Sequence, residues 1–239
     1  GMLQRPLAMV PCKTIPLEVP ADAEMVLECV TRPGERRAEA PFGEFAGTYG
    51  PQRMNPVLEI KAITRRQTPL YQSAFVGHAE NLLLSGLIRI PFIENTVRIA
   101  CPTVRRVAIP GSGLHRFICY VAIDTMIEGE AKQAAMAAFV ADPFLKFVVV
   151  VDADVDISSD SEVLRAIATR VRADRDVFMV PHAKGSPLDP ASEDPAAGSH
   201  LITKMGIDAT RKAAHPDEIM VPGADGIDLA DYIEGYKGR

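Results

Sequence analysis

The first third of the chain alternates apolar and polar positions with the period of a β-strand. Residues 23–32 and 55–66 both alternate in this way, and residues 69–75 form a further candidate strand. Residues 6–20 carry four prolines and predict an extended approach with little regular structure. The pattern as a whole indicates antiparallel β structure with wide turns.

Near residue 78 the pattern changes, and helices then alternate with strands. Residues 79–100 have a helical pattern that Pro91 interrupts. The other expected helices are 128–142 and 159–173, and the expected strands are 104–110, 115–124, 145–156 and 176–181. Alternation of this kind predicts a layered α/β domain. We therefore divide the chain into a β-rich part, residues 1–78, and an α/β part, residues 79–239.

Composition and charge exclude several classes of protein. Hydrophobic residues make up 47% of the 239 positions and charged residues 24%, as in ordinary globular proteins. The net charge of −5, without a long basic run, gives no electrostatic case for nucleic-acid binding. The longest apolar stretches are too short to cross a bilayer. The four cysteines form no C-x-x-C pair, so we expect a reducing cytoplasm and no disulfides.

An Asp-x-Asp sequence follows the apolar segment 145–156 and offers one chemical hypothesis. Asp152 and Asp154 at a strand end could hold a divalent metal that bridges a sugar-nucleotide diphosphate, as in a glycosyltransferase. The competing and favoured interpretation is that these aspartates, with Ser158 and Ser159, cap the next helix. No Gly-rich nucleotide fingerprint supports the transferase, and the five histidines show no zinc spacing. We therefore predict no metal site within this chain.

Two acids, Glu39 and Glu44, bracket a Pro-Phe-Gly turn in "RRAEAPFGEFAGTYG". The glycines at 43 and 47 allow close approach of a ligand. Two carboxylates held close in an apolar loop repel each other, so one of them takes the raised pKa that a general acid needs. The alternative is that both acids form surface ion pairs with arginines at 36, 37 or 53. Composition alone leaves both interpretations open.

Lys204 and the glycine-rich segment 110–116 are two further candidates for ligand binding. Lys204 lies among apolar neighbours after the long loop 182–200, where a phosphate partner would explain it. A lone lysine is more often a surface residue. The segment "PGSGLHR", residues 110–116, lacks the spacing of a phosphate-binding loop and precedes a strand, so a hairpin or wide loop is expected.

Four segments together resemble the UbiD family of decarboxylases, which use prenylated FMN. They are "VPADAEMVLECVTRPGERRAEAPFGEFAGTYG", "PVLEIKAITRRQTPLYQS", "KFVVVVDADVD" and "HLITKMGIDATRK". The segments occur in the family's order and extend over nearly the whole chain. The resemblance implies a partial split β-barrel of the flavin-reductase type, followed by a three-layer α/β domain that makes oligomer contacts.

The resemblance also implies roles for particular residues. Glu39 and Glu44 match two family acids that work with an arginine beside the prenylated flavin, and Glu44 is the expected proton donor. The substrate carboxylate is lost as CO₂ from a covalent adduct with the cofactor. Lys204 matches the lysine that approaches the cofactor phosphate. Ala40 replaces the usual glycine of the loop.

Members of this family are roughly twice as long, and the chain resembles their C-terminal half. The arginine of the catalytic trio and the Asn, His and Glu that hold a divalent metal on the flavin phosphate belong to the other half. We therefore expect a carboxy-lyase chain for an aromatic or α,β-unsaturated carboxylic acid, forming homo-oligomers and completed by a partner subunit. A non-catalytic oligomerisation or regulatory subunit, or a fragment of a longer enzyme, are the alternatives.

Overall fold

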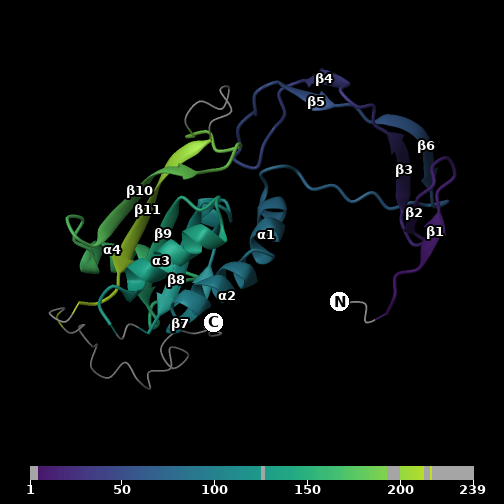
Figure 1. The fold of residues 1–239 in the computed structure, drawn as a ribbon. Coiled ribbons are helices and arrows are strands. Elements are labelled where there is room, and N and C mark those ends of the chain that lie inside the picture. The colour runs from purple at the N-terminus through teal and green to yellow at the C-terminus, as the bar shows by residue number, and fades with distance from the viewer. Residues whose placement is uncertain (1–4, 125–126, 193–199, 213–215, 217–239) are drawn as a thin grey trace, which may run out of the picture.

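The computed structural model describes residues 5–124, 127–192, 200–212 and 216. Its first part contains three antiparallel two-stranded sheets in this range, as the alternating pattern predicts. They pair β1 (Met9–Pro11) with β2 (Glu18–Pro20), β3 (Met25–Val30) with β6 (Glu59–Arg65), and β4 (Arg36–Glu39) with β5 (Arg53–Pro56). In Figure 1 the β1–β2 and β3–β6 sheets stand apart from the α/β domain, which the chain reaches through the segment before α1.

Two predictions for this part are wrong. Residues 69–75 form no strand, because Pro69 has no amide hydrogen and the amide of Leu70 donates to a carboxylate oxygen of Glu24 at 3.0 Å instead of to a neighbouring strand. Residues 6–20, expected to be an extended approach with little regular structure, instead contain the short β1–β2 hairpin. The split barrel as such stays a prediction.

Glu28 fastens the β1–β2 hairpin to β3. Its carboxylate accepts hydrogen bonds at 2.6 Å from the amides of Lys13 and Thr14 and from the Thr14 hydroxyl. These bonds, from the amide of Lys13 foremost, hold the pKa of Glu28 below its usual range. The side chain is buried, so an acid that looks like a solvent-facing strand residue in the sequence is a structural anchor.

The α/β domain is built on one five-stranded sheet in the order β10-β11-β9-β8-β7. Its strands are β7 (Val104–Ala108), β8 (Ile118–Ile123), β9 (Phe147–Asp152), β10 (Val177–Lys184) and β11 (Leu201–Ala209). The three central strands β8, β9 and β11 run parallel, while β7 and β10 pair antiparallel at the two edges. The apolar segment 145–156 therefore supplies the central strand, as predicted.

Helices cover both faces of this sheet, which gives the three layers that the resemblance implies. Val148 and Val150 of β9 belong to the core cluster under α2 (Ile90–Ala100) and α3 (Glu130–Ala141). Val149 and Val151 belong to the cluster under α4 (Asp160–Arg170). Successive side chains of a strand point to opposite faces, so one run of four valines supports both layers. The α/β fold class is confirmed.

The helix boundaries follow local sequence signals. The helical pattern 79–100 is divided into α1 (Ala79–Leu87) and α2, with Pro91 in the first turn of α2, where a missing amide hydrogen costs nothing. Ser159 caps α4 by accepting a hydrogen bond from the amide of Glu162, as the capping interpretation requires. Within the described part of the chain, no helix is both long enough and apolar enough to cross a membrane.

Candidate functional site

The loop after β4 is closed by its own main chain. The amide of Glu44 donates to the carbonyl of Thr48 at 2.8 Å, and the amide of Gly50 donates to the carbonyl of Phe42 at 2.8 Å. Gly47 takes a φ of +74°, which the turn requires and which other residues rarely adopt. These bonds fix the main chain on both sides of the Glu44 side chain.

The two acids of the loop lie in different surroundings. Glu39 is exposed at the end of β4 and accepts a hydrogen bond from the side-chain amide of Asn55. Glu44 is half-buried, and its Oε1 lies where a Cβ on Gly50 would come within 3.0 Å. Among the described residues, neither acid forms the surface ion pairs considered above, with the arginines at 36, 37 and 53. The Glu44 carboxylate is therefore half-buried beside Gly50, and none of these three arginines neutralises its charge.

Two contacts join this region to the α/β domain. Phe45, directly after Glu44, is buried, and its ring packs against the ring of Phe117 with centroids 5.4 Å apart. A guanidinium nitrogen of Arg53 donates to the carbonyl of Pro187 at 3.2 Å. The acid-bearing loop is thus anchored on the domain that follows it in the chain.

Lys204 of β11 is buried, so the surface interpretation is wrong. Its ammonium donates at 2.9 Å to the carbonyls of Pro143 and Leu145 and lies 5.3 Å from the ring centroid of Phe139. Burial lowers the pKa of Lys204 to about 8. No hydrogen bond or ion pair joins Lys204 to either acid in the described structure. Its contact with a cofactor phosphate stays a prediction.

Lys204 should make the stability of the protein depend on pH. In the unfolded chain the lysine titrates at its ordinary pKa of 10.5, so between about pH 8 and 10.5 the unfolded state binds more protons than the native state. The free energy of unfolding contributed by this residue therefore rises with pH across that window. We expect Lys204→Met to lose the rise in urea denaturation at several pH values, and Lys184→Met, at an exposed position of β10, to keep it.

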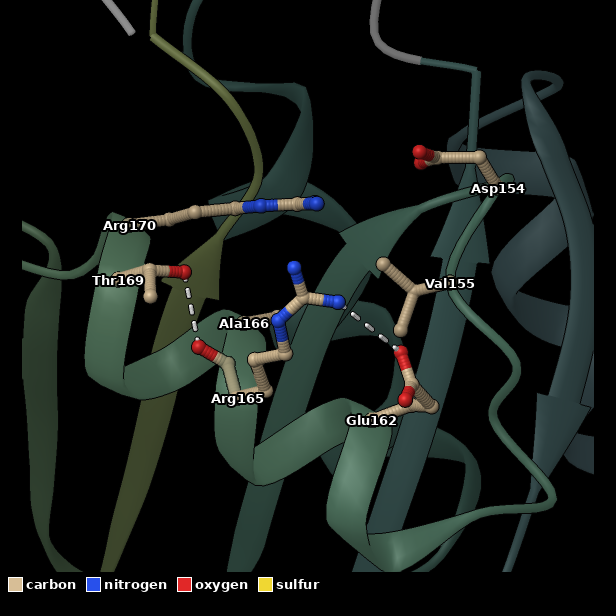
Figure 2. A pocket seen from close by; sticks show the side chains of 7 residues that line it. All are labelled: Asp154, Val155, Glu162, Arg165, Ala166, Thr169 and Arg170. Carbon is tan, nitrogen blue, oxygen red and sulfur yellow. Dashed lines mark hydrogen bonds and ion pairs between the residues drawn. The ribbon is translucent and has the colours of Figure 1, made fainter. Parts of the chain in front are cut away.

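The aspartates after β9 are bound to arginines. Asp152 accepts from a guanidinium nitrogen of Arg170 at 2.9 Å, and Asp154 pairs with Arg211 at 2.6 Å. The pocket at Asp154, shown in Figure 2, is lined by Asp154, Val155, Glu162, Arg165, Ala166, Thr169 and Arg170. Among the described residues, no group of three or more His, Cys, Asp or Glu side chains is placed to hold a metal. Nothing here supports the metal-dependent glycosyltransferase.

Comparison with known families covers most of the chain. The family description of the 3-octaprenyl-4-hydroxybenzoate carboxy-lyase C-terminal domain matches residues 83–209, and that of the Rift-related domain of the same enzyme matches residues 1–79. The chain belongs to the UbiD family. This membership confirms the family resemblance of the four sequence segments and replaces the glycosyltransferase hypothesis.

Individual UbiD proteins are similar over nearly the whole chain. Anhydromevalonate phosphate decarboxylase of Methanothermobacter thermautotrophicus is 38% identical over 212 residues, which are 89% of this chain and 49% of the relative. The UbiD-class enzyme HmfF from Pelotomaculum thermopropionicum, solved with FMN, matches with a TM-score of 0.86 and 43% identity over 96% of this chain and 51% of HmfF. An evolved dimeric HmfF, solved with prFMN, matches with a TM-score of 0.81, 39% identity and coverages of 96% and 49%.

A third UbiD-class protein acts on an aromatic acid. The apo structure of 3,4-dihydroxybenzoic acid decarboxylase (AroY) from Klebsiella pneumoniae matches with a TM-score of 0.84 and 27% identity, over 99% of this chain and 52% of AroY. The chain thus spans about half the length of the UbiD relatives that it matches.

Sequence reasoning missed one group beside the candidate site. The guanidinium carbon of Arg116 lies 4.3 Å from the ring centroid of Phe45, next to Glu44. Arg116 is the last residue of "PGSGLHR", which was expected only to form a wide loop and contains the short 3₁₀ helix η1 (Gly111–Gly113). The unusual glycine content before Arg116 was the only signal in the sequence, and it does not reveal which residue the arginine contacts.

Proposed function

We propose that the chain carries the acid/base glutamates of a prenylated-FMN-dependent decarboxylase acting on an aromatic or α,β-unsaturated carboxylic acid. The observation that carries the proposal is the half-buried Glu44 carboxylate, held by a closed loop without an ion-pair partner among the described residues. Two relatives are named as decarboxylases, and the UbiD-class enzyme HmfF was solved with FMN and with prFMN. Together these relatives support the assignment.

In this proposal Glu44, Glu39 and Lys204 each have a separate role in the reaction. Prenylated FMN, when bound, supplies a ring system that accepts the electron pair left when the carbon–carboxylate bond breaks. Protonated Glu44 then delivers its proton to the carbon that carried CO₂, and the resulting carboxylate is reprotonated before the next turnover. Glu39, the second acid of the loop, is assigned a supporting electrostatic role. Lys204 would be the residue of this chain that holds the cofactor phosphate.

The residues present fit such a cofactor in part. The side chains of Phe42 and Tyr49, on either side of Glu44 in the loop, are 59% and 81% exposed, so a flat apolar ring system could cover them. The described residues provide no cluster that would hold a divalent metal. We therefore assign the metal ligands, and the arginine that completes the catalytic trio, to residues of the other half of a UbiD-type protein.

An uncovered apolar surface supports completion by further UbiD-type polypeptide. Large apolar side chains of β3, β6 and the segments that flank β6 are more than half exposed: Leu27, Leu58, Ile63, Leu70, Tyr71 and Phe75. Exposed apolar area on this scale marks an interaction surface in a folded protein. We infer that the N-terminal half of a UbiD-type protein covers it, on a partner subunit or on the same polypeptide, and that the completed unit forms homo-oligomers.

The test is a spectrum and a product assay on the complete protein. The chain would be purified together with whatever polypeptide supplies the missing half, and CO₂ release would be measured from 3,4-dihydroxybenzoate and anhydromevalonate phosphate, the substrates of its named relatives. We expect visible flavin absorbance and CO₂ release that stops when the flavin is stripped. A complex without flavin absorbance would instead favour the non-catalytic oligomerisation or regulatory subunit.

A further inference from the structure

Arg116 links the loop that carries Glu44 to the α/β domain. Its guanidinium carbon lies 4.3 Å from the ring centroid of Phe45 and 5.3 Å from that of Phe144, and its Nη2 donates to the hydroxyl of Ser85 at 2.6 Å. Phe45 belongs to the acid-bearing loop, Ser85 to α1, and Phe144 to the segment between α3 and β9. One side chain therefore contacts three separate parts of the chain.

The main chain before Arg116 is held in an unfavourable conformation. Leu114 and His115 have φ values of +59° and +48°, in the left-handed region that side chains other than glycine rarely adopt. The imidazole Nδ1 of His115 lies 2.7 Å from the carbonyl oxygen of Ile109, and a Cβ on Gly86 of α1 would come within 3.0 Å of the His115 Cβ. Strain of this kind persists only where surrounding contacts enforce it, and here it fixes the direction of Arg116.

The position of Arg116 disfavours a positive charge, because it is half-buried and lies near a second arginine. Burial, together with the neighbouring charge of Arg89, lowers the pKa of Arg116. Arg89 itself is paired with Asp142, and its guanidinium carbon lies 5.1 Å from the ring centroid of Phe144. Burying a guanidinium that makes no ion pair within the described residues costs free energy. The two ring contacts and the one hydrogen bond of Arg116 offset this cost. This arrangement favours a defined role for Arg116 over a solvent-facing charge.

Phe45, on which Arg116 stacks, is joined to Glu44 by a single peptide bond. Phe45 is 7% exposed, so its ring and main chain have little room to move. A Cβ on Gly77 would lie 3.4 Å from the carbonyl oxygen of Phe45 and 3.5 Å from that of Glu44, so the segment before α1 packs against the same main chain. We propose that Arg116, by stacking on Phe45, positions the Glu44 carboxyl for proton transfer. The inference rests on the proposed role of Glu44.

The first test measures the loop itself, with Arg116→Met, which keeps the length of the side chain but removes its charge and planar face. We expect amide hydrogen exchange at Glu44, Gly47 and Gly50 to accelerate by about tenfold, while exchange in β9 stays unchanged. Arg98→Met, at an exposed position of α2, is the matched control and should leave the loop unaffected. Unchanged exchange at these three amides in Arg116→Met would overturn the inference.

The second test measures the reaction of the completed enzyme. Arg116→Met should lower kcat by about tenfold with little change in KM, because the substrate still binds while the proton donor is misplaced. Arg116→Lys keeps the charge but lacks the planar face, so it should recover less than half of the loss. Full recovery in Arg116→Lys would show that charge alone matters and would contradict positioning by stacking. If Arg116→Met does not fold, Phe45→Leu removes the same contact from the other side.

Glu44→Gln, measured in parallel, separates two kinds of failure. Unchanged turnover in Glu44→Gln would overturn the proposed function, and the role of Arg116 in proton transfer with it. Lost turnover in Glu44→Gln together with normal turnover in Arg116→Met would overturn only the positioning role. Lost turnover in both, with faster exchange in the loop of Arg116→Met, is the expected combination.

Discussion

Glu44→Gln is expected to lower the rate of decarboxylation by about 10²–10⁴-fold, the range that removal of a general acid or base commonly costs. Glutamine has the size of glutamate and leaves the hydrogen bond from the Glu44 amide to Thr48 intact, so the closed loop should survive. The amide side chain cannot deliver a proton to the carbon that has lost CO₂. The loss should therefore appear in kcat, measured as CO₂ release by the completed enzyme.

Two other substitutions make this measurement specific. Glu39→Gln should cost less than Glu44→Gln, because Glu39 is exposed, is bonded to Asn55 and acts only through its charge. Glu18→Gln, at an exposed position of β2, should retain full activity. A Glu44→Gln enzyme that is as active as the Glu18→Gln control would show that another group donates the proton.

Asp142→Asn is expected to lower the free energy of unfolding by about 3–5 kcal/mol, as removal of one partner from a buried ion pair commonly does. The side chains of Asp142 and Arg89 are only 7% and 15% exposed, and they pair directly. A carboxylate oxygen of Asp142 also accepts a hydrogen bond from the amide of Phe144 at 2.9 Å. The substitution would leave the Arg89 guanidinium buried without its countercharge, which is the main cost.

Urea denaturation of the parent and variant proteins measures this effect, with two comparisons. The double variant Arg89→Met with Asp142→Asn should recover much of the loss, since no unpaired cation remains in the interior. Asp174→Asn breaks a solvent-exposed pair with Arg172 and should leave the denaturation midpoint almost unchanged. Equal effects of Asp142→Asn and Asp174→Asn would contradict the structural importance assigned to the buried pair.

The α/β domain was predictable from sequence because its elements have strong local signals. The four successive valines of β9 can be accommodated only where both faces of a strand are covered, so they indicate a central strand. Pro91 marks the start of α2, and Ser159 with Glu162 marks the start of α4. Each signal reflects an energetic preference that acts over a few residues, and the surrounding structure agrees with it.

The parts that could not be predicted depend on contacts between distant segments. Residues 69–75 were expected to form a further strand, but in the described structure no strand pairs with them. The sequence indicated Glu39 and Glu44 as a pair of acids, yet it did not show that one would be exposed and the other half-buried. Likewise, nothing local to Arg116 indicates Phe45, since the two approach each other only when the loop docks on the α/β domain.

The position of β11 in the sheet has a consequence for synthesis of the protein. This strand is made after β7, β8, β9 and β10, yet it lies between β9 and β10 and pairs with both. While the ribosome has not yet released residues 201–209, the apolar β9 has one open edge and β10 has no partner in the sheet. Open strand edges of nascent chains invite association with other chains. The domain therefore depends on late, non-local strand insertion, a step that slows folding and lengthens the time during which these edges are open.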